Sequence, residues 1–202
     1  MFADGGRREL EKKARAEGRL PPGQSLTIKW PVLHYGSVPY FDAGRRDFKI
    51  SGFVATEKRL TWKEFAALPQ TEVVSDFHCV TRWSRLNNLW KGVLFADVLK
   101  LVEVKPEAQF VLVLAEEGYT ANVPLQDLIG PNVLFARDHD GEPLTAEHGG
   151  PLRLIVPQLY AWKSVKWVRG FTLLDHDSLG FWERNGYHAY GDPWKEQRYS
   201  AR

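Results

Sequence analysis

The sequence predicts a single strand-dominated α+β domain. Short runs of apolar or alternating residues recur along most of the 202-residue chain, whereas amphipathic helical patterns are few and short. The chain contains 8 Trp and 11 Phe residues, which suggests a rigid aromatic interior or a lined cavity. No internal repeat or linker interrupts the chain, and this length can bury one substantial core.

The N-terminal part of the chain differs from the rest. Residues 7–17 are highly charged, and Glu9 and Lys13 have the i,i+4 spacing of a salt-bridged helix. A glycine and two prolines follow and end this helix. We therefore expect a charged N-terminal arm over residues 1–25, packed at the periphery, and the main domain over residues 26–202.

The expected strands carry β-branched residues or alternate between apolar and polar residues. They cover residues 48–50, 73–77, 110–114, 119–125, 133–136, 152–156 and 165–174. A capping box predicts a short helix beginning at Thr61, and an apolar stripe predicts another helix over residues 93–102. The tail from Asp175 onward lacks periodicity but is rich in aromatic residues, so we expect a loop-rich segment packed on the body.

Composition and charge exclude several kinds of partner. The formal net charge is +2 and the basic residues are scattered, so we expect no nucleic-acid partner. No apolar run has the length of a membrane span, and the N-terminus lacks the apolar core of a secretory signal. The pair Arg7-Arg8 lacks the hydrophobic stretch of a twin-arginine signal. One cysteine and no signal predict a cytoplasmic protein.

The single cysteine, Cys79, follows an expected strand. A lone thiol can form neither an internal disulfide nor a four-cysteine zinc site. His78 and Arg82 stand near it in the sequence, and a nearby positive charge favours the thiolate, which is both a nucleophile and a soft metal ligand. The alternative interpretation is a buried structural cysteine.

Three further segments carry polar groups that could line a site. The first is the proline-rich loop over residues 30–39, which includes His34. In the second, His148 precedes two glycines that let the backbone approach a ligand, and Arg153 in an apolar strand needs an anion or carbonyl groups if it is buried. The third, residues 160–166, contains two lysines and a serine among aromatic residues and would suit an oxyanion. Taken singly, each segment also fits an ordinary structural or surface role.

Four motifs occur in the order and approximate spacing of one known family: residues 77–84 around the cysteine, 151–157, 162–166 and 180–187. On these motifs, the stretch from about Leu26 to Tyr199 resembles the molybdopterin-binding catalytic domain of sulfite oxidase-like proteins. It is most similar to the small members without a haem domain, such as the catalytic subunit of the bacterial protein-methionine-sulfoxide reductase. The resemblance implies the strand-dominated mixed fold of that catalytic domain.

The resemblance also implies a cofactor site. Cys79 is expected to bind molybdenum through its thiolate. The residues expected to bind the molybdopterin are His34, Ser37, Val38, Cys79, His148, Arg153, Ser164, Val165 and Lys166. Of these, Arg153 and Lys166 would neutralise the phosphate end of the cofactor. His34 and His148 stand where the reductase subunit has asparagines, and both residue types can form hydrogen bonds.

The implied function is a molybdopterin-dependent oxidoreductase that transfers an oxygen atom and two electrons on a small sulfur-containing or similar substrate. The reaction would be sulfite oxidation or sulfoxide reduction. Cys79 and Arg82 are the expected catalytic residues. An oxyanion substrate would need cations near the metal, and Arg82 and Lys163 are candidates, although Arg82 could instead pair with a carboxylate.

Two alternatives stay open at this point. In one, Cys79 is the nucleophile of a hydrolase, with His34, His139 or His148 as its base. In the other, the chain is a metal-free binding module with the same fold. The sequence has no haem-binding pair and no iron–sulfur cysteine set, so an oxidoreductase would exchange electrons with a separate, unidentified partner. The chain has no room for the immunoglobulin-like dimerisation domain of some relatives, so we expect a monomer.

Overall fold

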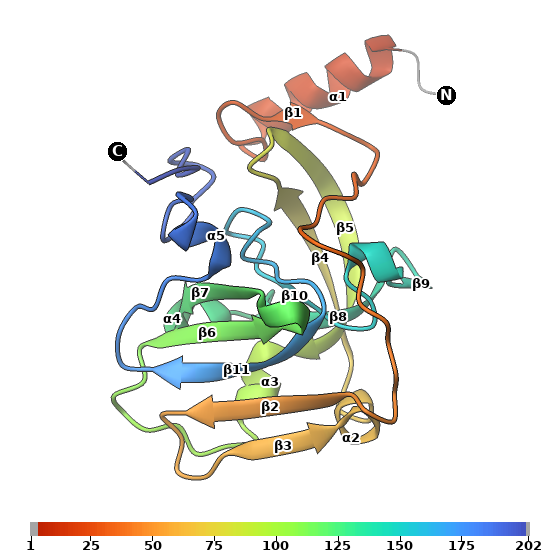
Figure 1. The fold of residues 1–202 in the computed structure, drawn as a ribbon. Coiled ribbons are helices and arrows are strands. Elements are labelled where there is room, and N and C mark those ends of the chain that lie inside the picture. The colour runs from red at the N-terminus through yellow and green to blue at the C-terminus, as the bar shows by residue number, and fades with distance from the viewer. Residues whose placement is uncertain (1–3, 201–202) are drawn as a thin grey trace.

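The computed structural model describes residues 4–200, in which two β-sheets form the body of the molecule (Figure 1). The first sheet has the order β1-β5-β8-β10, with β4 paired to β5 and β9 paired to β8. Its strands are β1 (Ser25–Leu26), β4 (Thr71–His78), β5 (Trp83–Leu94), β8 (Leu134–His139), β9 (Glu142–Pro143) and β10 (Arg153–Ile155). The second sheet has the order β3-β2-β11-β6-β7. Its strands are β2 (Asp47–Gly52), β3 (Lys58–Thr61), β6 (Phe110–Ala115), β7 (Thr120–Pro124) and β11 (Val168–Leu174).

Both sheets mix strand directions, because β1 runs parallel to β5 and β2 runs parallel to β11, whereas the other pairs are antiparallel. Apart from α1 (Asp4–Ala16), the helices are short. They are α2 (Trp62–Ala66), α3 (Phe95–Leu99), α4 (Leu125–Leu128), α5 (Phe181–Arg184) and the 3₁₀ turns η1 (Glu116–Gly118) and η2 (Ala146–His148). The strand-dominated α+β prediction is confirmed.

The sequence predicts the start of α2 correctly but not the length of α3. The Thr61 side chain accepts a hydrogen bond from the Glu64 backbone N–H, and the Glu64 carboxylate accepts one from the Thr61 N–H, so the capping box forms. The helix expected over residues 93–102 is only the five residues of α3, because β5 extends to Leu94. Hydrogen bonds to β8 hold this end of β5 as a strand.

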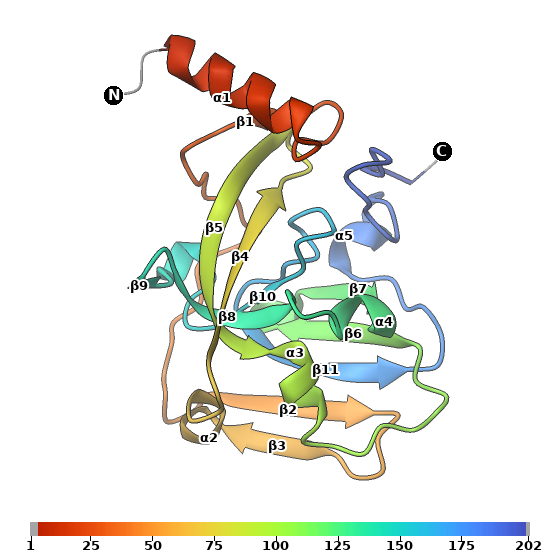
Figure 2. The same cartoon turned by 180° about the vertical axis from the view of Figure 1, so that it is seen from behind.

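The hairpin of β4 and β5 rises from the body of the molecule towards α1 (Figure 2). Its connecting turn is residues 79–82, which hold the cysteine. Further along, β5 passes so close to β8 that a Cβ at Gly92 would lie 2.0 Å from the backbone oxygen of Phe135. Only glycine fits there, because any side chain would clash with the β8 backbone.

The main core is aromatic, as the composition suggested. Phe48, Phe65, Phe95, Phe135 and Phe171 are buried and come from β2, α2, α3, β8 and β11. The Phe48 and Phe65 ring centroids lie 4.5 Å apart, and those of Phe95 and Phe171 lie 4.9 Å apart. Such ring pairs stabilise the core beyond the apolar area that they bury. This rigid packing fixes the strand ends around the site.

No helix within residues 4–200 has both the length and the apolar character needed to cross a bilayer.

Candidate functional site

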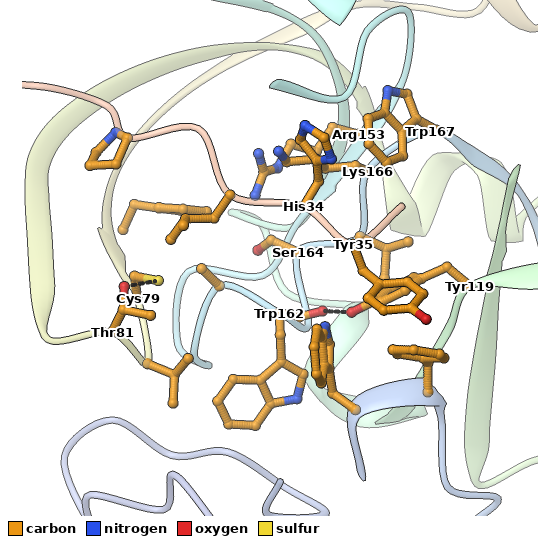
Figure 3. A pocket seen from close by; sticks show the side chains of 18 of the residues that line it. His34, Tyr35, Cys79, Thr81, Tyr119, Arg153, Trp162, Ser164, Lys166 and Trp167 are labelled. Carbon is orange, nitrogen blue, oxygen red and sulfur yellow. Dashed lines mark hydrogen bonds between the residues drawn. The ribbon is translucent and has the colours of Figure 1, made fainter. Parts of the chain in front are cut away.

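A cavity of about 310 Å³ opens where the turn after β4, the loop over residues 30–39, the loop before β11 and α5 meet (Figure 3). Six residues expected at the cofactor site line it: His34, Cys79, Arg153, Ser164, Val165 and Lys166. The other lining residues are mainly aromatic, and they include Trp30, Tyr35, Phe77, Trp83, Tyr119, Trp162, Trp167, Phe181, Trp182 and Tyr187. The cavity is therefore aromatic-walled with a few polar groups, as ligand sites generally are.

Cys79 begins the turn over residues 79–82. Its backbone N–H donates to Trp83 O at 2.9 Å, and the Arg82 N–H donates to Cys79 O at 3.1 Å. The side chain is 6% exposed, and burial raises the pKa of the thiol. A hydrogen bond with Thr81 and the positive charges of Arg153 and Arg198 act in the opposite direction and lower that pKa. A thiol in this setting is suited to bind a metal, which would displace its proton.

The two flanking residues that the sequence offered as thiolate-stabilising cations do not act in that way. His78 Nδ1 lies 2.8 Å from Ser84 Oγ, and burial lowers the pKa of His78 to about 4, so its ring is neutral at pH 7. Arg82 is exposed, has a φ of 72° and does not line the cavity. The positive φ of Arg82 turns its side chain away from the direction that an extended strand would give it.

Arg153 is buried at 4% exposure in β10 and reaches the cavity wall. One guanidinium nitrogen donates to His148 O at 3.0 Å, and the guanidinium lies 5.0 Å from the Phe77 ring and 5.5 Å from the Trp30 ring. Its Nε has no hydrogen-bond partner, and no carboxylate of residues 4–200 pairs with it. Burial lowers the pKa of Arg153 to about 10. A buried cation without a counter-ion is the arrangement expected of an anion site.

Lys166 adds a second positive charge beside Arg153. Its Nζ donates to Glu147 O at 2.5 Å, and burial together with the Arg153 charge lowers the pKa of Lys166 to about 7. In Figure 3, Arg153, Lys166 and His34 gather on one side of the cavity and Cys79 lies on the other. A bound anion would favour the protonated lysine and restore its charge.

The loop before β11 supplies the middle of the wall. Ser164 and Val165 are both buried, and Ser164 Oγ accepts a hydrogen bond from the Val156 N–H at 2.9 Å. Tyr119 closes the wall beside them, since its hydroxyl donates to Trp162 O at 3.1 Å. Trp83 Nε1 is another buried cavity-lining donor without a partner among the described residues. Unpaired donors in a cavity wall suit a ligand rich in acceptor atoms.

Three residues expected at the cofactor do not reach the cavity. Ser37 is exposed and donates to Glu117 Oε1 at 2.9 Å, and Val38 is half-buried outside the lining. His148 stacks on Trp30 with ring centroids 3.9 Å apart, and its Nε2 lies 3.1 Å from Trp30 O. His148 therefore packs against the lining residue Trp30, and its backbone carbonyl accepts a hydrogen bond from Arg153.

Sequence reasoning missed most of the aromatic wall. Its signal was present in the high tryptophan content, but the sequence could not assign single rings to the cavity or to the core. Thr81 was also missed, although it lies two residues beyond the cysteine, because a threonine in a turn has no distinctive signal.

Comparison with known proteins places these features in a family. Residues 35–182 match the family described as the oxidoreductase molybdopterin binding domain. The chain is 46% identical over 190 residues to the uncharacterised oxidoreductase YuiH of Bacillus subtilis (strain 168), a match that covers 94% of this chain and 96% of the relative.

More distant relatives are longer than this chain. The putative protein-methionine-sulfoxide reductase subunit YedZ1 of Azospira oryzae is 28% identical over 84% of this chain and 66% of the relative. The sulfite oxidase of Arabidopsis thaliana is 26% identical over 84% of this chain and 54% of its own length.

The fold has a counterpart among solved structures. The sulfane dehydrogenase SoxCD of Paracoccus pantotrophus superposes with a TM-score of 0.66 at 22% identity, over 76% of this chain and 43% of that one. This likeness concerns the fold alone. Together with the family match over residues 35–182, it agrees with the resemblance carried by the cysteine motif. The chain belongs to the molybdopterin-binding oxidoreductase family that includes the sulfite oxidases.

Proposed function

We propose that this molybdopterin-dependent oxidoreductase transfers an oxygen atom to or from a small sulfur-containing substrate in a two-electron reaction, with Cys79 as a molybdenum ligand. One observation supports the proposal most strongly. A buried thiol and a buried guanidinium that has no carboxylate partner among the described residues line the same aromatic cavity. A thiolate is a soft ligand for a redox-active metal, and a guanidinium is a strong phosphate donor.

The residues of the cavity fit the cofactor of the family. Cys79 would hold the metal, and the orphaned Nε of Arg153 together with Lys166 would hold the phosphate. Ser164 and Val165 would line the pterin between these ends, with His34 facing it from the opposite loop. The acceptor-rich ring system of a pterin would also suit the unpaired indole donor of the cavity wall.

When bound, the cofactor supplies the two-electron redox chemistry. The protein supplies the water-excluding walls and the charged groups that surround the cofactor. Its aromatic walls exclude water, which strengthens every electrostatic interaction inside. Arg153 is held in place by the His148 carbonyl and two aromatic rings, so it meets an anion without reorganising. Half-buried Lys166 holds a proton when an anion is present and gains charge with it.

The surroundings of Cys79 favour a neutral substrate and hence sulfoxide reduction. Val80, Trp162, Trp182 and Tyr187 pack around the cysteine, and the Trp182 and Tyr187 rings stack with centroids 4.9 Å apart. Among the described lining residues, Arg153 and Lys166 are the only arginine and lysine, and both are assigned to the cofactor phosphate. An oxyanion such as sulfite would therefore lack a cation of its own. Sulfoxide reduction consumes two electrons and two protons and yields a sulfide and water.

The hydrolase alternative lacks a base. Within residues 4–200, the side-chain hydrogen bond found for Cys79 Sγ is with Thr81, and no imidazole nitrogen is found hydrogen-bonded to it. His34 Nδ1 lies 3.1 Å from Gly36 O, and His139 Nε2 accepts from Arg85 at 3.0 Å. A thiol nucleophile needs a base within hydrogen-bond reach, so this geometry favours the metal-ligand role.

Metal analysis tests the proposal directly. Protein purified from a molybdenum-replete host should contain molybdenum close to stoichiometric with the chain. With a reduced viologen as electron donor, it should reduce methyl phenyl sulfoxide and should not oxidise sulfite when an electron acceptor is supplied. Protein without molybdenum from such a host would contradict the redox function and favour a metal-free binding module. Turnover of sulfite by the loaded protein would contradict only the substrate preference.

The electron partner, the monomeric state and the cytoplasmic location remain predictions from the sequence.

A further inference from the structure

The hydroxyl of Thr81 lies against the sulfur of Cys79. Thr81 Oγ1 and Cys79 Sγ are 3.1 Å apart, and both residues line the cavity (Figure 3). Among the described residues, this is the only hydrogen bond found for the Thr81 side chain. Its hydroxyl proton is thus available to the sulfur and is not committed to a backbone oxygen.

Two buried side chains from other parts of the chain donate hydrogen bonds to the backbone of the turn that carries both residues. Gln24, which is 1% exposed, donates from Nε2 to Cys79 O at 3.0 Å. Arg198, which is 5% exposed, donates from Nη1 to Val80 O at 2.6 Å. These donors come from the two terminal segments of the chain and satisfy consecutive carbonyls of the turn. The spacing between Thr81 and the sulfur is therefore fixed by the fold and not by the turn alone.

The direction of this hydrogen bond follows from chemistry. A thiol can donate to or accept from a hydroxyl, but a deprotonated sulfur bound to a metal can only accept. Thr81 must then be the donor. A hydrogen bond to a ligating sulfur withdraws electron density from it, weakens it as a donor to the metal and makes the metal easier to reduce.

We propose that Thr81 is a positioning residue whose hydroxyl donates to the ligating sulfur of Cys79 and raises the reduction potential of the molybdenum centre. This inference rests on the proposed function, because it requires Cys79 to bind the metal. No bond is made or broken in this role, and the Thr81 proton stays on its oxygen.

The test compares two substitutions in the molybdenum-loaded protein. Thr81→Val keeps the shape of the side chain and removes the hydroxyl, whereas Thr81→Ser keeps the hydroxyl. Potentiometric titration followed by the electron paramagnetic resonance of molybdenum(V) should show a lower potential and an altered signal for Thr81→Val. Thr81→Ser should return both towards the wild-type values. Thr71→Val, at the far end of β4, is the matched control and should change neither.

Molybdenum content and thermal melting, measured on each variant, separate the possible failures. Equal metal content with the wild-type potential and signal in Thr81→Val would overturn the inference and leave the proposed function standing. A potential that shifts equally in the Val and Ser variants would also overturn it, because the hydroxyl would then not be the cause. A wild-type protein without molybdenum would overturn both proposals. Thr81→Ala provides a second hydroxyl-free variant in case the valine disturbs the turn.

Discussion

The ammonium of Lys163 lies 2.6 Å from the carboxylate of Glu183, and both side chains are almost wholly buried. The indole N–H of Trp162 donates to the same carboxylate oxygen at 2.8 Å. Lys163 also donates to the backbone oxygens of Asn122 and Ala189 at 2.7 and 2.6 Å. The lysine that the sequence offered for binding an oxyanion is thus a structural cation outside the cavity, and it ties α5 to β7 behind a lining tryptophan.

Removing the carboxylate of this pair should destabilise the fold strongly. Glu183→Gln leaves the Lys163 charge buried without a counter-ion, a change that typically costs ~3–5 kcal/mol. Urea unfolding of the metal-free protein measures the loss. The matched control is Glu72→Gln at an exposed pair with Lys91, where we expect a change of less than about 1 kcal/mol. Equal effects of the two substitutions would contradict the structural role of Glu183.

Arg153→Met should weaken cofactor retention more than it weakens the metal-free fold. The substitution keeps an apolar side chain of similar length against Trp30 and Phe77 but removes the charge. Loss of a charge-assisted hydrogen bond of ~1.5–3 kcal/mol corresponds to about 10- to 150-fold weaker retention of the phosphate-bearing group. Pterin and molybdenum content after dialysis report the retention, and thermal melting of the metal-free protein reports the fold. A melting loss as large as in Glu183→Gln, with retention unchanged, would make Arg153 purely structural.

Stability should fall as the pH drops from 6.5 to about 4. Burial lowers the pKa of His139 from 6.5 to about 4, although Asp140 opposes this shift, while the positive charges of Arg85 and Arg153 add to it. Between these pH values the unfolded chain binds more protons at this residue, so its contribution is fully present above pH 6.5 and is lost as pH falls through this window. His78, with a pKa of about 4, contributes in the same direction.

The His139 contribution can be isolated by substitution. In His139→Gln, the difference in unfolding free energy between pH 7 and pH 4.5 should be smaller than in the wild type. His176→Gln, at an exposed histidine, should leave the difference unchanged. An identical pH dependence in wild type and His139→Gln would show that the imidazole is not buried as a neutral group.

Cys79→Ser should abolish turnover and leave the fold largely intact. Oxygen replaces sulfur with little change in shape, but a serine hydroxyl is a poor ligand for a soft metal site. Sulfoxide reduction and thermal melting of the same preparation check the two halves of this prediction. Full activity in the variant would exclude Cys79 as a metal ligand.

Features that depend on a short local motif could be predicted from the sequence. Cys79, Arg153 and Lys166 were recognised from their motifs, and the structure brings all three to one cavity. The capping box likewise located α2, because its hydrogen bonds join residues three positions apart.

The remaining features of the site depend on contacts between residues far apart in the sequence, which local patterns do not reveal. Arg82 is the last residue of the cysteine turn, but its side chain is exposed and does not line the cavity. His148 faces Trp30, a partner more than a hundred residues away, instead of the cavity. Gln24 and Arg198 meet at one turn from opposite ends of the chain, a contact that no local pattern could indicate.

X-ray absorption at the molybdenum edge tests the central claim most directly. Wild-type protein and Cys79→Ser, both purified from a molybdenum-replete host, should differ by one sulfur neighbour of the metal, with the wild type having the extra one. The same number of sulfur neighbours in both proteins, at equal molybdenum content, would contradict the assignment of Cys79 as the metal ligand.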